Sequence, residues 1–212
     1  MIGAILCDIE GTTTSLSFVH DVLFPISRDR MESYTRDHWS ELLLLVKDIG
    51  SNPEEVARVL RAWIDEDRKE GVLKQIQGKI WKDAFESGAI RAHVYPDVSR
   101  NWIAWKQRGI RIYIFSSGSV EAQKLLFAHT EEGDLTQLIN GYFDTTTGPK
   151  KEAGSYKKIA KILNIKPEEV LFFSDVAEEL DAARSAGMQT LLINREGSKV
   201  VRVSRPQSFA YE

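Results

Sequence analysis

The chain has 212 residues and a formal net charge of −3, and 42% of its residues are hydrophobic and 28% charged. This composition is typical of a globular protein with one large domain, or with a core domain that carries an insertion. The basic residues are scattered, which argues against a nucleic-acid-binding face. Cys7 is the single cysteine, so an intrachain disulfide and a multi-cysteine metal site are both excluded.

The apolar segments of the sequence are short. The N-terminus has no positively charged leader, and Asp8 interrupts its apolar run, so we expect no signal peptide. The longest strongly apolar run elsewhere, residues 42–46, is far too short to cross a bilayer. The sequence therefore predicts a soluble, cytoplasmic, monomeric protein without nucleic-acid or membrane partners.

The first predicted element is a buried strand, residues 2–7, which ends at two acids. A continuous apolar run of this length fits a sheet that is covered on both faces. Alternation along a strand would place Asp8 and Glu10 on the same side of the backbone. Gly11 allows a sharp exit, and three threonines follow at 12–14. This set suits a hard cation and a phosphate, and the alternative is an ordinary acidic loop.

Residues 15–94 are predicted to form an inserted, all-helical cap, because no strand pattern appears in this part of the chain. Pro25 indicates a break or a helix start. Asn52 and Pro53 form a helix-start signal, with the asparagine as the cap. The predicted helical stretches cover residues 18–26, 31–47, 53–63 and 73–85.

Beyond residue 94 the pattern changes to alternating helices and strands. The predicted helices are 97–107, 120–128, 155–163 and 178–186, and the predicted strands are 110–115, 142–144, 170–173 and 190–193. This alternation predicts an α/β fold with a Rossmann-like parallel sheet and helices on both faces. The strand at 2–7 must join that sheet, because alone it could not be buried. The predicted core therefore comprises residues 1–14 and 95–212, with a possible edge strand at 204–209.

Chemically active side chains follow four of the predicted strands. Ligands of open parallel sheets bind beyond the carboxyl ends of the strands, so these side chains are expected at one edge. A serine run before a helix can be a simple cap, and loop lysines are often solvated. The order of acids, hydroxyls, cation and acid nevertheless fits a phosphate site. In chain order the residues are Asp8 and Glu10, Ser116 and Ser117, Lys150 or Lys151, and Asp175.

These four segments resemble the four motifs of the haloacid dehalogenase superfamily. Most members have an aspartate at the position of Glu10. With this glutamate and the segments 92–98 and 116–127, the chain is more closely similar to the enolase-phosphatases (acireductone synthases) of methionine salvage. The resemblance extends over nearly the whole chain.

The resemblance implies a Mg²⁺-dependent enzyme. The alternatives are a general small-molecule phosphatase of the same superfamily and a non-catalytic module that binds a phosphorylated ligand. The substrate of the enolase-phosphatase would be 2,3-diketo-5-methylthiopentyl-1-phosphate, which is enolised and then dephosphorylated. Asp8 would attack phosphorus, and one Mg²⁺ per chain would be held by the side chains of Asp8 and Asp175 and by the main-chain carbonyl of Glu10. The phosphate would be bound by Ser116, Ser117 and Lys150, with Lys151 as the alternative lysine.

The enolisation step also needs a base. Glu10 is the first hypothesis, because its side chain could serve both steps, and His93 and His129 are the alternatives. The cap is expected to close over the substrate. Its large aromatic side chains either line the substrate pocket or form the core of the cap, and they are Trp39, Trp63, Trp81 and Phe85.

Overall fold

The computed structural model of the chain describes residues 1–195. These residues form two compact units: Met1–Leu16 together with the described chain from Arg91 onward, and Ser17–Ile90. No helix in the described part is long and apolar enough to cross a membrane. The edge strand predicted at 204–209 lies outside the described residues.

The first unit is built on a parallel five-stranded sheet. Its strand order is β3-β2-β1-β4-β5, so β1 lies at the centre. Because all the pairings are parallel, the carboxyl ends of the strands share one edge of the sheet. The strands are β1 (Ala4–Cys7), β2 (Arg111–Phe115), β3 (Gly141–Phe143), β4 (Val170–Ser174) and β5 (Gln189–Leu192).

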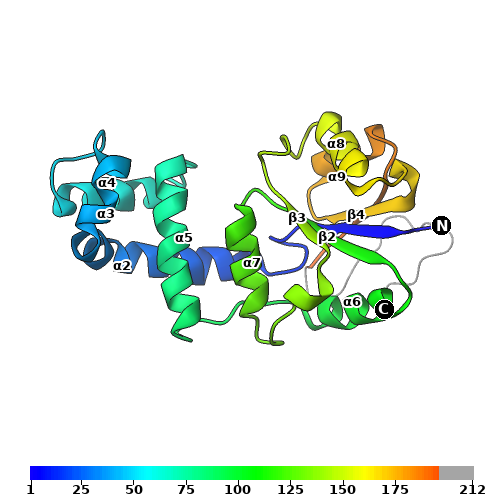
Figure 1. Ribbon diagram of the computed structural model, residues 1–212, viewed down its shortest axis with the longest axis horizontal. Helices are drawn as coiled ribbons and strands as arrows, with labels where there is room; N and C mark the ends of the chain where they lie inside the picture. Colours follow the sequence, from blue (N-terminus) through cyan, green and yellow to red (C-terminus); the bar gives the residue numbers. More distant parts are fainter. Residues whose placement is uncertain (196–212) are drawn as a thin grey trace. The chain divides into compact units, whose positions relative to one another are not determined.

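Helices cover both faces of this sheet, as the apolar strands predict. Figure 1 shows α8 and α9 on one side and α6 on the other. On the first face the Tyr156 ring lies 5.2 Å from the Phe172 ring, and on the second Trp105 stacks on Phe173 at 5.6 Å. Burial of each such aromatic side chain contributes roughly 1.5–3 kcal/mol. The helices are α6 (Pro96–Gln107), α7 (Val120–Ala128), α8 (Ala153–Leu163) and α9 (Ala177–Ser185).

The second unit is helical throughout, with a core of its own. Met31, Leu42 and Leu60 are fully buried in this core. The four large aromatic side chains of this unit are held within it: Trp39 and Trp63 lie against the core, Phe85 is buried, and the Trp81 indole donates to the Leu23 carbonyl at 2.8 Å. The helices are α2 (Phe24–Asp37), α3 (Trp39–Val46), α4 (Pro53–Asp65) and α5 (Gly71–Glu86), preceded by the short α1 (Leu16–Phe18) and a π-helical turn at Val19–Leu23.

The helix boundaries in this unit differ from the sequence prediction at two positions. The predicted gap between 26 and 31 is wrong, because α2 runs from Phe24 to Asp37. The stretch 31–47 was predicted as continuous, and this is wrong, because α2 ends at Asp37 and α3 begins at Trp39. Between them His38 has φ −112° and ψ 22°, and its ring stacks on Tyr34 at 4.1 Å. The predicted start of α4 is confirmed, since the Asn52 side chain accepts from the Glu55 amide at 2.9 Å.

Candidate active site

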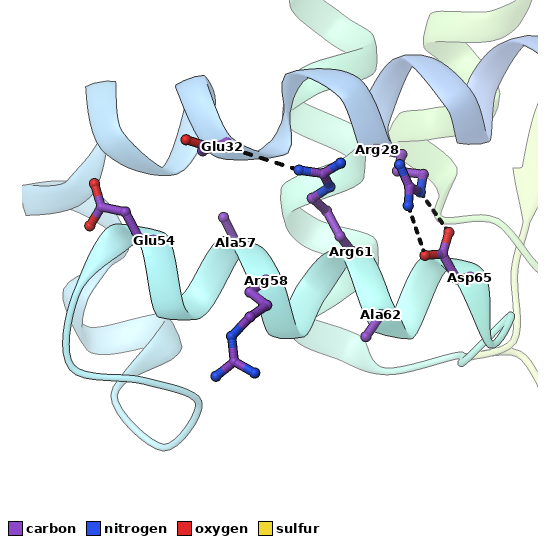
Figure 2. A pocket seen from close by; sticks show the side chains of 8 residues that line it. All are labelled: Arg28, Glu32, Glu54, Ala57, Arg58, Arg61, Ala62 and Asp65. Carbon is purple, nitrogen blue, oxygen red and sulfur yellow. Dashed lines mark hydrogen bonds and ion pairs between the residues drawn. The ribbon is translucent and has the colours of Figure 1, made fainter.

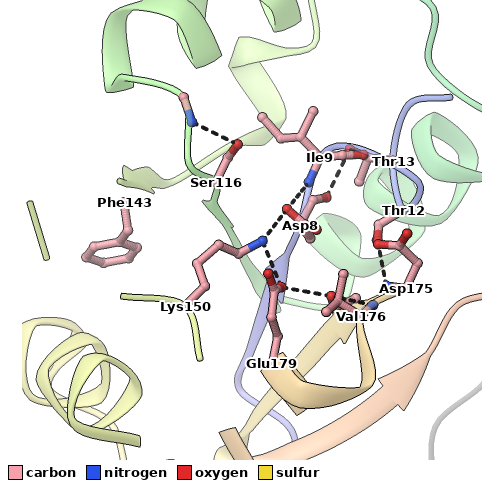
Figure 3. A network of polar contacts seen from close by, with 12 residues as sticks. Asp8, Ile9, Thr12, Thr13, Ser116, Phe143, Lys150, Asp175, Val176 and Glu179 are labelled. Carbon is pink, nitrogen blue, oxygen red and sulfur yellow. Dashed lines mark hydrogen bonds and ion pairs between the residues drawn. The ribbon is translucent and has the colours of Figure 1, made fainter. Parts of the chain in front are cut away.

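The polar site lies beyond the carboxyl ends of the strands, where side chains from β1, the β3–α8 loop and α9 meet (Figure 3). The Lys150 ammonium is 2.7 Å from Asp8 Oδ1 and 2.7 Å from Glu179 Oε2. All three side chains are almost completely buried. The Ser174 hydroxyl donates to the same Glu179 oxygen at 2.9 Å, so the glutamate is held from two sides.

The loop after β1 is a tight turn rather than a continuation of the strand. The amides of Thr12, Thr13 and Thr14 all donate to the Ile9 carbonyl, at 2.9–3.2 Å. Strand alternation therefore does not relate Asp8 to Glu10, because the strand ends at Cys7. Glu10 is half-buried and pairs through its backbone with Thr14.

Asp175 packs directly against this turn. The Thr12 hydroxyl donates to Asp175 Oδ1 at 3.3 Å and accepts from the Asp175 amide at 3.1 Å. Gly11 has φ +70°, and a Cβ at this position would lie 2.1 Å from Asp175 Oδ2. Only glycine leaves room for the carboxylate here. Asp175 thus contacts the loop that carries Asp8.

The serine loop after β2 is fixed by backbone contacts. Ser116 is buried, its amide donates to the Phe143 carbonyl at 3.2 Å, and its hydroxyl accepts from the Gly118 amide at 3.3 Å. The buried Gln123 side chain donates to the carbonyls of Gly118 and Phe143. Ser117 is exposed. The loop leads into α7, where the Val120 amide donates to Asp144 Oδ2 at 3.3 Å and the Ala122 amide donates to the Ser119 hydroxyl at 3.2 Å.

The structure distinguishes between the two candidate lysines. Lys150 reaches Asp8, whereas Lys151 is exposed. The Lys150 carbonyl accepts from the Tyr156 hydroxyl at 2.6 Å, and the Ser155 hydroxyl donates to the Pro149 carbonyl at 2.6 Å. Two side chains at the start of α8 therefore fix the position of this loop.

The network carries more negative than positive charge. The carboxylates of Asp8 and Glu179 both contact the Lys150 ammonium, and Asp175 adds a third negative charge beside the loop after β1. The pKa of Asp8 is raised to about 7, chiefly because burial disfavours the charged form; Lys150 lowers this pKa and Glu179 raises it. Burial likewise raises the pKa of Asp175. Burial lowers the pKa of Lys150, but the two carboxylates outweigh it and leave that pKa raised. An additional cation would relieve this imbalance.

The oxygen donors of the site fit a divalent cation. Mg²⁺ binds one or two protein carboxylates and completes its shell with carbonyl, water or phosphate oxygens. Asp8 and Asp175 supply two carboxylates next to one turn, and the Glu10 carbonyl belongs to the same loop. No cluster of three or more His, Cys, Asp or Glu side chains that could hold a metal occurs within residues 1–195. A site with two carboxylates needs no such cluster.

Glu179 is the site residue that sequence reasoning left without a role. It follows Asp175 by four residues and lies in the first turn of α9, and its neighbour Glu178 is exposed. Its closeness to Asp175 was visible in the sequence. What the sequence does not contain is the side-chain packing that directs Glu179 to Lys150.

A concave surface lies in the helical unit, between α2 and α4 (Figure 2). It is an open groove of about 370 Å³. Its charges pair with one another, for example Arg28 with Asp65 at 2.6 Å. Exposed pairs of this kind carry little energy and leave no unbalanced charge for a ligand.

The parallel sheet and the buried aspartate–lysine pair at its carboxyl edge define a hydrolase of the haloacid dehalogenase-like class. The model of the haloacid dehalogenase-like hydrolase family matches residues 2–187. The chain is 49% identical to enolase-phosphatase E1 of Sorangium cellulosum, over 92% of this chain and 89% of the relative.

Solved structures agree with this assignment. The crystal structure of the UTR4 protein of Saccharomyces cerevisiae has a TM-score of 0.83 and 35% identity, over 100% of this chain and 96% of that one. CbbY of Rhodobacter sphaeroides, crystallised with phosphate, shares the fold at 19% identity, with a TM-score of 0.59 over 92% of this chain and 87% of that one.

The chain belongs to the haloacid dehalogenase-like hydrolases and, within them, to the enolase-phosphatase E1 family. The resemblance, the fold class and the enzymatic nature expected from the sequence are thereby confirmed. Phosphatases of this superfamily generally use a divalent metal ion and act on small phosphate esters.

Proposed function

We propose that the chain converts 2,3-diketo-5-methylthiopentyl-1-phosphate to the acireductone 1,2-dihydroxy-3-keto-5-methylthiopentene in methionine salvage. The reaction comprises an enolisation and the hydrolysis of a phosphate monoester. The observation that carries the proposal is the buried Asp8–Lys150 contact at 2.7 Å, in a chain 49% identical to enolase-phosphatase E1 of Sorangium cellulosum.

Asp8 is the proposed nucleophile, and its two oxygens are not equivalent. Oδ1 accepts from Lys150 at 2.7 Å and from the Ile9 amide at 2.7 Å. No hydrogen bond to Oδ2 is found in the part of the chain that the structure describes, and we assign the attack to this oxygen. A bond forms between Oδ2 and phosphorus while the bond from phosphorus to the substrate oxygen breaks. Water then hydrolyses the aspartyl phosphate and releases inorganic phosphate.

The phosphate is held by the groups around Asp8. Lys150 carries the positive charge that stabilises the phosphoryl oxygens during transfer. The Ser116 hydroxyl and the Ser117 amide, in the loop between β2 and α7, are the proposed donors to phosphate. Asp8, Asp175 and the Glu10 carbonyl would hold Mg²⁺. When bound, this ion offsets the repulsion between the nucleophile and the phosphate.

Glu10 is proposed to protonate the leaving oxygen and to act as the enolisation base. His93, one of the two alternative bases, is disfavoured by a hydrogen bond. The Ser15 amide donates to His93 Nδ1 at 3.1 Å, which places the proton of the neutral ring on Nε2. His93 therefore presents a donor instead of a basic nitrogen. The His129 ring bonds through Nδ1 to the Leu125 carbonyl at 3.0 Å, as a structural contact at the end of α7.

Cytoplasmic location, a monomeric state and the cap role of the helical unit stay predictions. We place the cap at residues 15–94, inserted between the two parts of the core, 1–14 and 95–212. A cap of this kind would exclude water during phosphoryl transfer and recognise the methylthio end of the substrate.

The test is an assay with the diketone phosphate that follows two signals. Phosphate release reports dephosphorylation, and the ultraviolet absorbance of the enol reports enolisation. We expect both signals with the wild type, neither phosphate release nor product with Asp8→Asn, and no enol with Glu10→Gln. Phosphate release without an enol would identify a general phosphatase instead. Unchanged turnover in Asp8→Asn would exclude the catalytic assignment.

A further inference from the structure

Arg195 lies three residues beyond the end of β5 and contacts the loop after β1. Its Nε and Nη2 both donate to the Thr12 carbonyl, at 2.9 and 2.6 Å. Its Nη1 donates to both carboxylate oxygens of Asp97, at 2.8 and 2.9 Å. The guanidinium carbon lies 4.0 Å from the centre of the Tyr95 ring. One guanidinium thus joins β5, the start of α6 and the loop that carries Asp8.

The burial of these groups makes the contact specific to arginine. The Arg195 side chain is 11% exposed and that of Asp97 is 19% exposed. A charge this deep needs a paired partner, and Asp97 supplies it. Arginine can form two bonds to one carbonyl, a bidentate pair with a carboxylate and a stacking contact at the same time. A lysine ammonium has neither the planar fork nor the stacking face.

Thr12 connects this cluster to the proposed metal site. Its carbonyl faces Arg195, while its hydroxyl exchanges two hydrogen bonds with Asp175. The neighbouring Gly11 backbone also packs against the Asp175 carboxylate, with no space for a Cβ between them. Any shift of the Thr12 carbonyl therefore moves the groups that set the orientation of Asp175.

We propose that Arg195 is a positioning residue of the active site, which fixes the orientation of the Asp175 carboxylate through Thr12. Asp97 and Tyr95 hold the guanidinium in place for this role. The inference rests on the proposed function, because that function makes Asp175 a metal ligand. Removal of a group that orients a metal ligand commonly lowers metal affinity or activity about 10- to 100-fold.

Direct Mg²⁺ binding tests the inference, measured by isothermal titration calorimetry on the full-length, metal-free protein. We expect Arg195→Ala to raise the Kd of Mg²⁺ by about 10- to 100-fold. The sign of the change is diagnostic, because loss of a nearby positive charge would by itself tighten the binding of a cation. Arg184→Ala is the matched control, since Arg184 bonds to Thr190 and pairs with Asp181. We expect the Kd of Mg²⁺ for Arg184→Ala to equal that of the wild type.

Chemical rescue adds a measurement that a merely structural role would not affect. Millimolar guanidinium chloride should restore part of the Mg²⁺ affinity of Arg195→Ala, whereas sodium chloride at equal ionic strength should not. Arg195→Lys should stay close to the alanine variant, because the ammonium cannot reproduce the fork. Should Arg195→Ala fail to fold, the charge-neutral Tyr95→Leu is expected to weaken Mg²⁺ binding in the same direction.

Unchanged or tighter Mg²⁺ binding in Arg195→Ala would overturn the inference and leave the proposed function intact. Equal weakening in Arg184→Ala would also overturn it, since the effect would then be a general loss of structure. Absence of Mg²⁺ binding in the wild type would instead refute the metal assignment of the proposed function, and the inference with it.

Discussion

Lys150 is shared between two carboxylates, and this sharing explains how it stays in place during the reaction. Its Nζ is 2.7 Å from both Asp8 and Glu179. Asp8 is the proposed nucleophile, and a bond to phosphorus would change its charge during each turnover. In this proposal Glu179 takes no part in that bond. It therefore provides Lys150 with a constant partner while the ammonium binds the phosphoryl group.

Substitution of Glu179 by glutamine tests this role. The amide keeps the size of the side chain but removes the charge that holds Lys150. We expect Glu179→Gln to lower kcat about tenfold, or ~1.4 kcal/mol in activation free energy. Glu178→Gln is the matched control, because Glu178 is the exposed neighbour on the same helix. Steady-state kinetics with Mg²⁺ in excess measure the effect, and equal values of kcat for the two variants would contradict it.

Gly11 allows a second test, since its backbone conformation and its contact with Asp175 can be separated. Gly11 and Gly88 have nearly the same φ, +70° and +72°, and only Gly11 has a neighbour within 4 Å of the missing Cβ. Alanine at either position costs about 1–2 kcal/mol of backbone strain. We expect both variants to be destabilised by this amount. Only Gly11→Ala is expected to lose phosphatase activity, because the added methyl group would displace Asp175. Urea unfolding and kcat measure the two effects. Full activity in Gly11→Ala would show that Asp175 tolerates displacement.

Most of the residues that sequence analysis found lie just beyond the end of a strand. Asp8, Ser116 and Asp175 lie at strand ends, where a parallel sheet gathers its ligands. Glu179 and Arg195 could not be assigned in this way. Glu179 depends on how α9 packs beside the β3–α8 loop, and Arg195 reaches Thr12 across 183 positions of sequence. Contacts of that kind follow from tertiary packing and leave no local pattern.

At the scale of elements, apolar periodicity locates helices better than it locates their ends. The break at His38 occurs without glycine or proline, and the residues on either side keep an apolar pattern. The His38 ring is instead held by the Tyr34 carbonyl at 3.1 Å and by the Tyr34 ring. Pro25 is the second residue of α2 and has no amide to donate to the turn before it. A π-helical turn before it allows the helical path to continue.

The cap of α4 is an element whose energy can be measured. The Asn52 side chain accepts from the Glu55 amide at 2.9 Å, and the Glu55 carboxylate accepts from the Ser51 amide at 2.9 Å. We expect Asn52→Ala to destabilise the helical unit by ~1 kcal/mol, because the amide loses its partner. Asn52→Asp keeps an acceptor and should stay near the wild type. Tryptophan fluorescence in a urea titration measures both, and equal losses would show that the acceptor is not the cause.

At the scale of the whole molecule, the parallel sheet was predictable while its strand order was not. Alternating helices and strands imply parallel pairing, whatever the order of the strands. The central place of β1 between β2 and β4 follows from which apolar faces pack together. This order brings Asp8 between the serine loop and Asp175. The role of residues 15–94 as a cap stays a prediction.

The two compact units imply that metal binding stabilises one part of the chain selectively. All the proposed ligands belong to the first unit: Asp8 and Glu10 follow β1, and Asp175 follows β4. A ligand stabilises the structure that forms its site by RT ln(1 + [L]/Kd), or about 2.7 kcal/mol at 100 Kd. Units that open independently do not share this gain. We therefore expect Mg²⁺ to slow amide hydrogen exchange in β1 and β4 and to leave α4 (Pro53–Asp65) unchanged.

Hydrogen exchange followed by mass spectrometry, with Mg²⁺ and then with EDTA, measures this difference. The slowing in β1 and β4 should reach about 100-fold at 100 Kd, because exchange follows the opening equilibrium. EDTA should reverse it, and Asp8→Asn should reduce it by removing one ligand. Equal slowing in α4 would mean that the two units open together. No slowing in β1 would place the metal elsewhere, because Asp8 is the residue that follows this strand and its carboxylate would have to contact the ion.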